Sequence, residues 1–265
     1  MAELSRPPAT PLIFAHRRVS SIPAREEIKE DQPHAFNGNL CPRGSDTVQV
    51  LVDTSILIAT GAAHNINGVA RFDGRYAGRA FTTQAIRDEI NHRALNANPN
   101  IPTLASAAKR ARDYLVKSGR VQVQNTPQTR EFFSKMQLIH TKLRELAKAR
   151  QPSGVTSSEM QKHAGEATLI AIAGLYSNPV LLTNDGGASL AAAAEDPSIK
   201  SLHFGDVLKE FVCQSKGELS LDQAKLAFIA ACEASGIPFE AKPEDEDDFF
   251  TCGLTAGAEA CLFCT

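Results

Sequence analysis

Four acidic residues, each beside an apolar segment, have the clearest capacity for chemistry in this sequence. Asp53 follows the run VQVLV, and Asp185 follows the run PVLLTN. Glu89 lies in TTQAIRDEI, and Glu166 lies in HAGEATLIAIA. Taken singly, Asp53 and Asp185 could cap the helices that follow them. Glu166 could complement a helix dipole, and Glu89 could be a solvated charge on a helix face.

Taken together, the four carboxylates indicate a metal site. Two ionised carboxylates about 4 Å apart repel by roughly 4 kcal/mol at an effective dielectric constant near 20. Four of them in one cleft would therefore take up protons or move apart without a counter-ion. Oxygen ligands without a cluster of His or Cys favour Mg²⁺ or Mn²⁺ over Zn²⁺. Of the histidines, only His163, three residues before Glu166, has a spacing that could bring it to the site, and we do not count it among the ligands.

The elements that must position these acids follow from the apolar pattern. Short segments at 48–52, 120–124, 178–185 and 198–204 predict strands. They alternate with helical patterns, which include a helix that begins at Thr82 or Thr83, one at 102–117 and one at 129–149. This alternation predicts an α/β fold with a central, mostly parallel β-sheet. In such sheets ligands bind beyond the carboxyl ends of the strands, where Asp53 and Asp185 are expected to lie.

The composition divides the chain into three parts. Residues 1–46 hold many Pro, Arg, Glu and Ser residues without a sustained period, which predicts a disordered or loosely attached arm. Residues 47–212 hold the alternating pattern, and residues 213–265 hold one further helix and an acidic tail with cysteines. The net charge is −2. Residues 87–150 nevertheless carry an excess of cations, which could line a groove for RNA or could simply be solvated helix faces.

The ordered motifs resemble those of a known family. VLVDTSILIA, the Glu-Ile of TTQAIRDEI, HAGEATLIAIA and VLLTND are similar, in that order, to the acidic motifs of the PIN-domain ribonucleases, which include the VapC-type toxins of bacterial toxin-antitoxin pairs. The resemblance spans about Val48 to Val212. It implies a PIN-like three-layer fold with helices on both sides of the sheet. It also implies a metal-dependent endoribonuclease that acts on RNA, a homodimer and, for the toxins, an antitoxin partner.

The same resemblance implies the roles of individual residues. The metal ligands and catalytic residues would be Asp53, Glu89, Glu166 and Asp185, with Mg²⁺ or Mn²⁺ as the cofactor. Ser55 and Thr183 would be polar supports beside the metal. Asp88 remains an alternative to Glu89, since both lie on one helical turn and only the following Ile90 favours Glu89.

Two other functions are alternatives to the ribonuclease. A non-catalytic PIN-like scaffold that binds a protein partner is the main rival. A phosphatase with Asp53 as nucleophile ranks lower, because Ser55 stands where one such class would have a second Asp.

No run approaches the roughly 18 uncharged apolar residues of a membrane span. The N-terminus also lacks the features of a signal peptide, so we expect a cytoplasmic protein without a membrane partner.

Overall fold

The computed structural model describes residues 48–150, 163–215 and 218–235. The predicted N-terminal arm and the acidic tail with its cysteines lie outside these residues. None of the described helices is both long enough and apolar enough to cross a membrane.

In the described part of the chain, five parallel strands form the central sheet, in the order β3-β2-β1-β4-β5. The strands are β1 (Gln49–Val52), β2 (Ala80–Thr83), β3 (Gln122–Gln124), β4 (Pro179–Leu182) and β5 (Lys200–Leu202). Every described pair of neighbours is parallel. The prediction of an α/β fold with a central, mostly parallel sheet is therefore confirmed.

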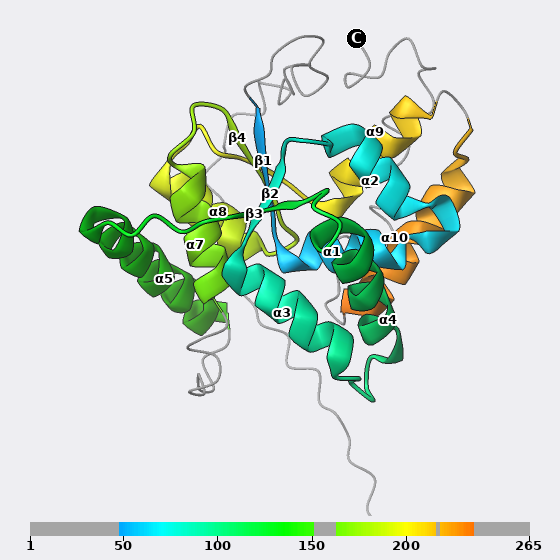
Figure 1. The fold of residues 1–265 in the computed structure, drawn as a ribbon, viewed down its shortest axis with the longest axis horizontal. Coiled ribbons are helices and arrows are strands. Elements are labelled where there is room, and N and C mark those ends of the chain that lie inside the picture. The colour runs from blue at the N-terminus through cyan, green and yellow to red at the C-terminus, as the bar shows by residue number, and fades with distance from the viewer. Residues whose placement is uncertain (1–47, 151–162, 216–217, 236–265) are drawn as a thin grey trace, which may run out of the picture. The chain divides into compact units, whose positions relative to one another are not determined.

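Helices cover both faces of this sheet, as Figure 1 shows. On one face α5, α7 and α8 pack together, and on the other α1 packs against α4, α9 and α10. α3 lies at the carboxyl edge of the sheet and contacts both α4 and α7. The helices are α1 (Thr54–Ala62), η1 (His64–Ile66), α2 (Gly68–Tyr76), α3 (Gln84–Leu95), α4 (Pro102–Ala111), the π-helical segment η2 (Arg112–Val116), α5 (Arg130–Arg150), α7 (Ala164–Ala173), α8 (Gly186–Glu195), α9 (Phe204–Gln214) and α10 (Leu221–Ser235).

The core follows the three-layer arrangement. Val50, Leu51 and Val52 of the central strand β1 are buried, as expected for a strand that helices cover on both faces. On α5 the apolar stripe buries Phe132, Ile139 and Leu143. The layers on the two faces thus bury the apolar patterns from which the strands and helices were predicted.

Two elements differ from the sequence expectation. Residues 80–83 form β2 before α3 begins, whereas the sequence pattern assigned this stretch to the start of a helix. The predicted N-cap is nevertheless confirmed, because the Thr83 hydroxyl accepts a hydrogen bond from the Ile86 amide (3.3 Å). α2 was not predicted, and its glycines Gly68 and Gly74 are residues that weaken a helical pattern.

The last described helix, α10, packs within the main core. Its buried apolar residues are Ala224, Ala227, Phe228, Ala231 and Ala234. They face α1, α4 and α9, although the sequence placed this helix beyond the core. The packed unit therefore extends past residue 212, to at least the end of α10.

Candidate functional site

The strand order creates a crevice between β1 and β4. β1 connects onward to β2 on one side, while β4 lies on its other side and connects onward to β5. Such a reversal of direction leaves a space beyond the carboxyl ends of the two strands, where ligands of open α/β sheets bind. Val52 is paired with Leu182, and the Asp53 amide donates to the Leu182 carbonyl (3.0 Å). Asp53 and Thr183 therefore begin the two loops that border this space.

Asp53 is held by donors from both loops. Its Oδ2 accepts hydrogen bonds from Ser55 Oγ (2.8 Å) and Thr183 Oγ1 (3.1 Å). Asp53 occupies the N-cap position of α1, but its side chain makes no capping hydrogen bond, so the capping role considered from the sequence is not realised. Only 4% of Asp53 is exposed, and burial followed by the charge of Glu89 raises the pKa of its carboxyl. The hydrogen bonds that it accepts oppose this rise.

Asp185 combines a structural role with a place at the site. Its Oδ1 accepts from the amides of Gly187 (2.6 Å) and Ala188 (3.2 Å), which caps α8 as the sequence allowed. Its own amide donates to Thr183 Oγ1 (3.1 Å), the same hydroxyl that donates to Asp53. One threonine thus links the two aspartates that follow β1 and β4.

Glu166 enters from the first turn of α7, and its carboxyl is also perturbed. Its Oε2 lies 2.6 Å from His163 Nδ1. Burial raises the pKa of Glu166 from its ordinary 4.5 to about 7. The hydrogen bond from His163 opposes this rise, and the negative charges of Asp53 and Asp185 add to it. The carboxylates of Asp53 and Asp185, which follow β1 and β4, are therefore close enough to Glu166 of α7 to interact with it electrostatically.

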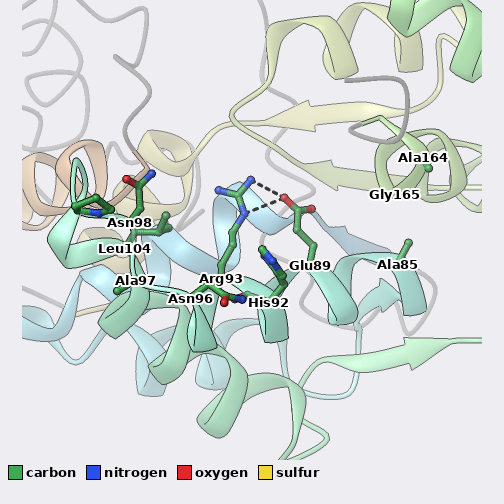
Figure 2. Close-up of a pocket in the computed structure, with 11 residues that line it drawn as sticks. Ala85, Glu89, His92, Arg93, Asn96, Ala97, Asn98, Leu104, Ala164 and Gly165 are labelled. Atoms are coloured by element: carbon green, nitrogen blue, oxygen red, sulfur yellow. Dashed lines mark hydrogen bonds and ion pairs between the residues drawn. The ribbon is translucent and has the colours of Figure 1, made fainter. Parts of the chain in front are cut away.

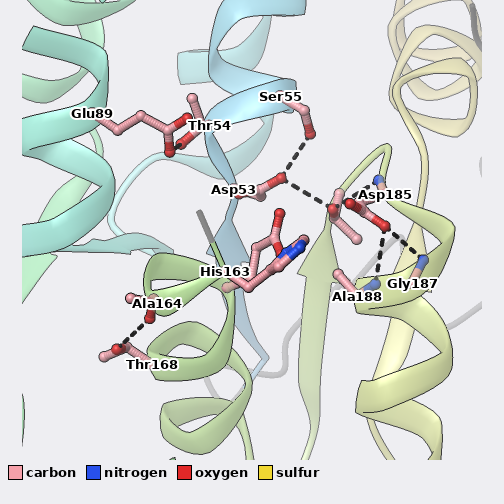
Figure 3. Close-up of polar contacts among 12 residues, drawn as sticks. Asp53, Thr54, Ser55, Glu89, His163, Ala164, Thr168, Asp185, Gly187 and Ala188 are labelled. Carbon is pink, nitrogen blue, oxygen red and sulfur yellow. Dashed lines mark hydrogen bonds and ion pairs between the residues drawn. The ribbon is translucent and has the colours of Figure 1, made fainter. Parts of the chain in front are cut away.

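The donor atoms fit a divalent cation. One ligand atom from each of His163, Glu166 and Asp185 lies within 4.8 Å of the other two. Figure 3 shows Asp53, His163 and Asp185 around the same space beyond β1 and β4. Carboxylate oxygens suit Mg²⁺ or Mn²⁺, and a histidine that hydrogen-bonds a ligand carboxylate commonly fixes its orientation.

Glu89 lies at the flank of this cluster rather than within it (Figure 3). Its Oε2 accepts from Thr54 Oγ1 (2.6 Å), and its Oε1 accepts from both Nε (2.9 Å) and Nη2 (2.6 Å) of Arg93. Asp88 is exposed and accepts from Gln84 Nε2 (2.7 Å) on the surface of α3. Of the two candidates on this turn, Glu89 is the one that faces the site.

Sequence reasoning passed over two side chains of this region. His163 was noted for its spacing of three from Glu166 but was not counted among the ligands, and the structure brings the two into contact. Arg93 was counted only as one of many cations. Its spacing of four from Glu89 was the available signal, because i,i+4 pairs face one another on a helix.

The cation-rich stretch 87–150 does not form one uniform basic wall. Several of its cations are engaged by acids: Arg112 and Lys117 with Asp113, Arg120 with Asp73, and Lys135 with Glu195. The Arg110 guanidinium donates to the Gly61 carbonyl (2.6 Å). Acidic side chains thus neutralise part of the positive charge of this stretch.

No protein-family model, no curated protein and no solved structure matches this chain. The fold and the site define an α/β protein with a histidine-supported acidic cluster at the switch point of a parallel sheet. Its function must be inferred from that geometry.

Proposed function

We propose that the protein is an endoribonuclease that hydrolyses RNA phosphodiesters with Mg²⁺ or Mn²⁺ bound at the acidic cluster. The observation that carries the proposal is the convergence of Asp53, Glu166 and Asp185 beyond two neighbouring strands, where ligands of parallel sheets bind. The resemblance of the motifs to those of PIN-domain ribonucleases agrees with this chemistry.

The electrostatics of the cluster support a cation there. The pKa values of Asp53 and Glu166 are both raised, by burial and by the other acids. Groups in this condition bind protons or a metal ion to relieve their repulsion. When bound, a divalent cation supplies a Lewis acid and lowers the pKa of a water molecule beside the phosphodiester.

The surrounding side chains have positioning roles under this proposal. Ser55 and Thr183 hold the Asp53 carboxylate in one orientation, since both donate to its Oδ2. His163 fixes Glu166, and the two amides at the start of α8 fix Asp185. Glu89, bound by Thr54 and Arg93, adds negative charge at the flank of the site. These contacts maintain the acids in place before a cation binds.

The partners and the location follow from the same proposal. RNA is the substrate, and the resemblance to VapC-type toxins adds a second copy of the chain and an antitoxin as partners. An RNA-cleaving enzyme of this kind would act in the cytoplasm. Size-exclusion chromatography with light scattering tests the dimer, and the neighbouring reading frame tests the antitoxin.

The test is cleavage of a pool of labelled RNAs by the wild type and by Asp53→Asn, each with Mn²⁺, Mg²⁺ or EDTA. Asp53→Asn keeps the shape of the side chain but removes its charge. We expect metal-dependent cleavage by the wild type and a loss of about 100-fold or more in the variant, as for other groups that hold a catalytic metal. Asp88→Asn, an exposed acid on α3, is the matched control and should cleave like the wild type.

Calorimetric titration with Mn²⁺ separates the rival functions. A saturable Mn²⁺ site that disappears in Asp53→Asn supports the nuclease. A folded wild type that binds no Mn²⁺ and cleaves no RNA contradicts it and favours the scaffold. Hydrolysis of small phosphate esters, without RNA cleavage, would instead favour a phosphatase.

A further inference from the structure

A cavity of about 750 Å³ opens beside the acidic cluster (Figure 2). α3 and the segment after it form one side, and the start of α7 forms the other. Glu89 belongs to this lining, and Ala164 and Gly165 of the lining directly follow His163. Through Glu89, the cavity lies at the flank of the acidic cluster where we place the metal. Its size lies within the roughly 300–1,000 Å³ of small-molecule sites.

Arg93 supplies the cavity with a guanidinium that Glu89 holds in place. Its Nε and Nη2 both donate to Glu89 Oε1 (2.9 and 2.6 Å). Figure 2 shows the guanidinium between Glu89 and Asn98, with its third nitrogen directed away from Glu89. About a third of the Arg93 side chain is exposed (33%), so a ligand can reach it. A guanidinium in this position suits a phosphate, which accepts two parallel hydrogen bonds.

Two asparagines add a donor and an acceptor to the same cavity. The Asn96 Nδ2 donates to the His92 carbonyl (2.8 Å), so its Oδ1 is without a partner among the described residues. The Asn98 Oδ1 accepts from the Asn100 amide (3.0 Å), which leaves its Nδ2 without a described partner. Asparagine amides are well suited to the edges of nucleobases, which present donors and acceptors side by side.

We propose that this cavity binds one nucleotide of the RNA strand, next to the phosphodiester at the acidic cluster. Arg93 contacts the phosphate of that nucleotide, and Asn96 and Asn98 pair with the edge of its base. This inference rests on the proposed function and narrows it, since a base edge is open to such contacts only when the base is unpaired. The inference thus adds to the proposed RNA cleavage a preference for one base at this position.

The test uses the full chain in EDTA, titrated with adenosine, guanosine, cytidine and uridine 5′-monophosphates and followed by NMR or calorimetry. We expect saturable binding with different affinities for the four nucleotides. Ala97 is exposed and lines the cavity, so Ala97→Phe fills it without touching the acids. This variant should lose about 10-fold or more in affinity, as should Asn98→Ala. Ala193→Phe, at an exposed alanine of α8, is the matched control and should bind like the wild type.

The outcomes distinguish this inference from the proposed function. Asp53→Asn should retain nucleotide binding while it loses Mn²⁺ binding. If the wild type cleaves RNA but Ala97→Phe changes neither nucleotide affinity nor the bases at which cleavage occurs, the cavity proposal is wrong and the nuclease stands. If nucleotides bind as expected but no metal binds and no RNA is cut, the cavity proposal stands and the nuclease is wrong. Absence of saturable nucleotide binding up to millimolar concentrations also overturns the cavity proposal.

Discussion

The carboxylates of the acidic cluster repel one another, and the fold keeps them close together. Asp53 is buried behind β1, and Glu166 is fixed by His163 at the start of α7. Burial and neighbouring charge raise the pKa of both carboxyls. At neutral pH and without a cation, ionisation of these groups opposes folding. Without a bound cation, the acidic cluster therefore lowers the free energy of unfolding.

This cost predicts a pH dependence of stability for the metal-free protein. A carboxyl whose folded pKa is raised stabilises the fold fully below its unfolded pKa and loses that contribution as the pH rises through the folded pKa. For Glu166 this window runs from 4.5 to about 7. At about 1.4 kcal/mol for each pH unit, the loss is about 3 kcal/mol. Denaturant unfolding in EDTA should therefore show that Glu166→Gln narrows the difference in stability between pH 5 and pH 8 by about that amount.

The matched control for this measurement is Glu131→Gln, an exposed acid in the first turn of α5. It should leave the difference between pH 5 and pH 8 as it is in the wild type. An equal pH dependence in Glu166→Gln and the wild type would show that Glu166 does not carry the repulsion described here.

At this scale the sequence predicts positions better than contacts. The placement of Asp53 and Asp185 at strand ends follows from apolar runs that stop at an acid. The resemblance predicted Thr183 as a polar support, but its contacts with both Asp53 and the Asp185 amide depend on the register between β1 and β4 and could not be predicted. The contact between Arg93 and Glu89 is visible as an i,i+4 pair, but the cavity beside it arises only where α3 meets α7.

At the scale of the elements, the tight contact between α1 and α4 depends on a single glycine. A Cβ atom at Gly61 would clash with the carbonyl of Ala107 in α4. We expect Gly61→Ala to lower the free energy of unfolding by about 2 kcal/mol or more, because the backbone atoms there cannot yield as a flexible side chain could. Chemical denaturation measures this loss.

Gly74 provides the comparison, since it also lies within a helix. A Cβ atom at Gly74 of α2 would meet no atom within 4 Å. Gly74→Ala should therefore raise stability by about 0.5–1 kcal/mol, the ordinary gain from alanine over glycine in a helix. Similar effects of the two substitutions would contradict the tight contact between α1 and α4.

The elements that sequence patterns predicted correctly are those with their own boundary signals. β1 and β4 are apolar runs that end at polar residues, and α5 has a long amphipathic period. β2 has no such boundary, because Thr83 is both the last residue of the strand and the N-cap of α3. Its strand conformation is stabilised by pairing with β1 and β3, which are distant in sequence.

At the scale of the whole molecule, α10 decides where the folded unit ends. Phe228 is only 5% exposed, whereas Ile229 beside it is 43% exposed. Phe228→Ala should lower the free energy of unfolding by about 3–5 kcal/mol through the cavity that it leaves. Ile229→Ala, the matched control, should change it by about 0.5 kcal/mol or less. Equal effects would mean that α10 is not part of the cooperative unit.

The boundary at residue 212 illustrates what composition leaves undetermined. The acidic stretch after α10 suggested a separate C-terminal part, and the alternation of strands and helices stops with α9. The small residues of α10, among them Ala224, Ala227 and Ala231, allow it to pack closely against α1. Alanines alone do not mark a helix as buried, so its place in the core could not be inferred from sequence.

The position of β4 in the sheet also determines when the acidic cluster can assemble during synthesis of the chain. Asp53 and Thr183 are 130 residues apart, although they share a hydrogen bond. At about 5–20 residues per second, the ribosome needs roughly 10 s to deliver β4 after β1. Until β4 is made, one edge of β1 has no partner strand, and Asp185, which follows β4, does not yet exist. The acidic cluster therefore cannot assemble on the first two-thirds of the nascent chain, and under the proposed function such a chain cannot cleave the ribosomal RNA beside it.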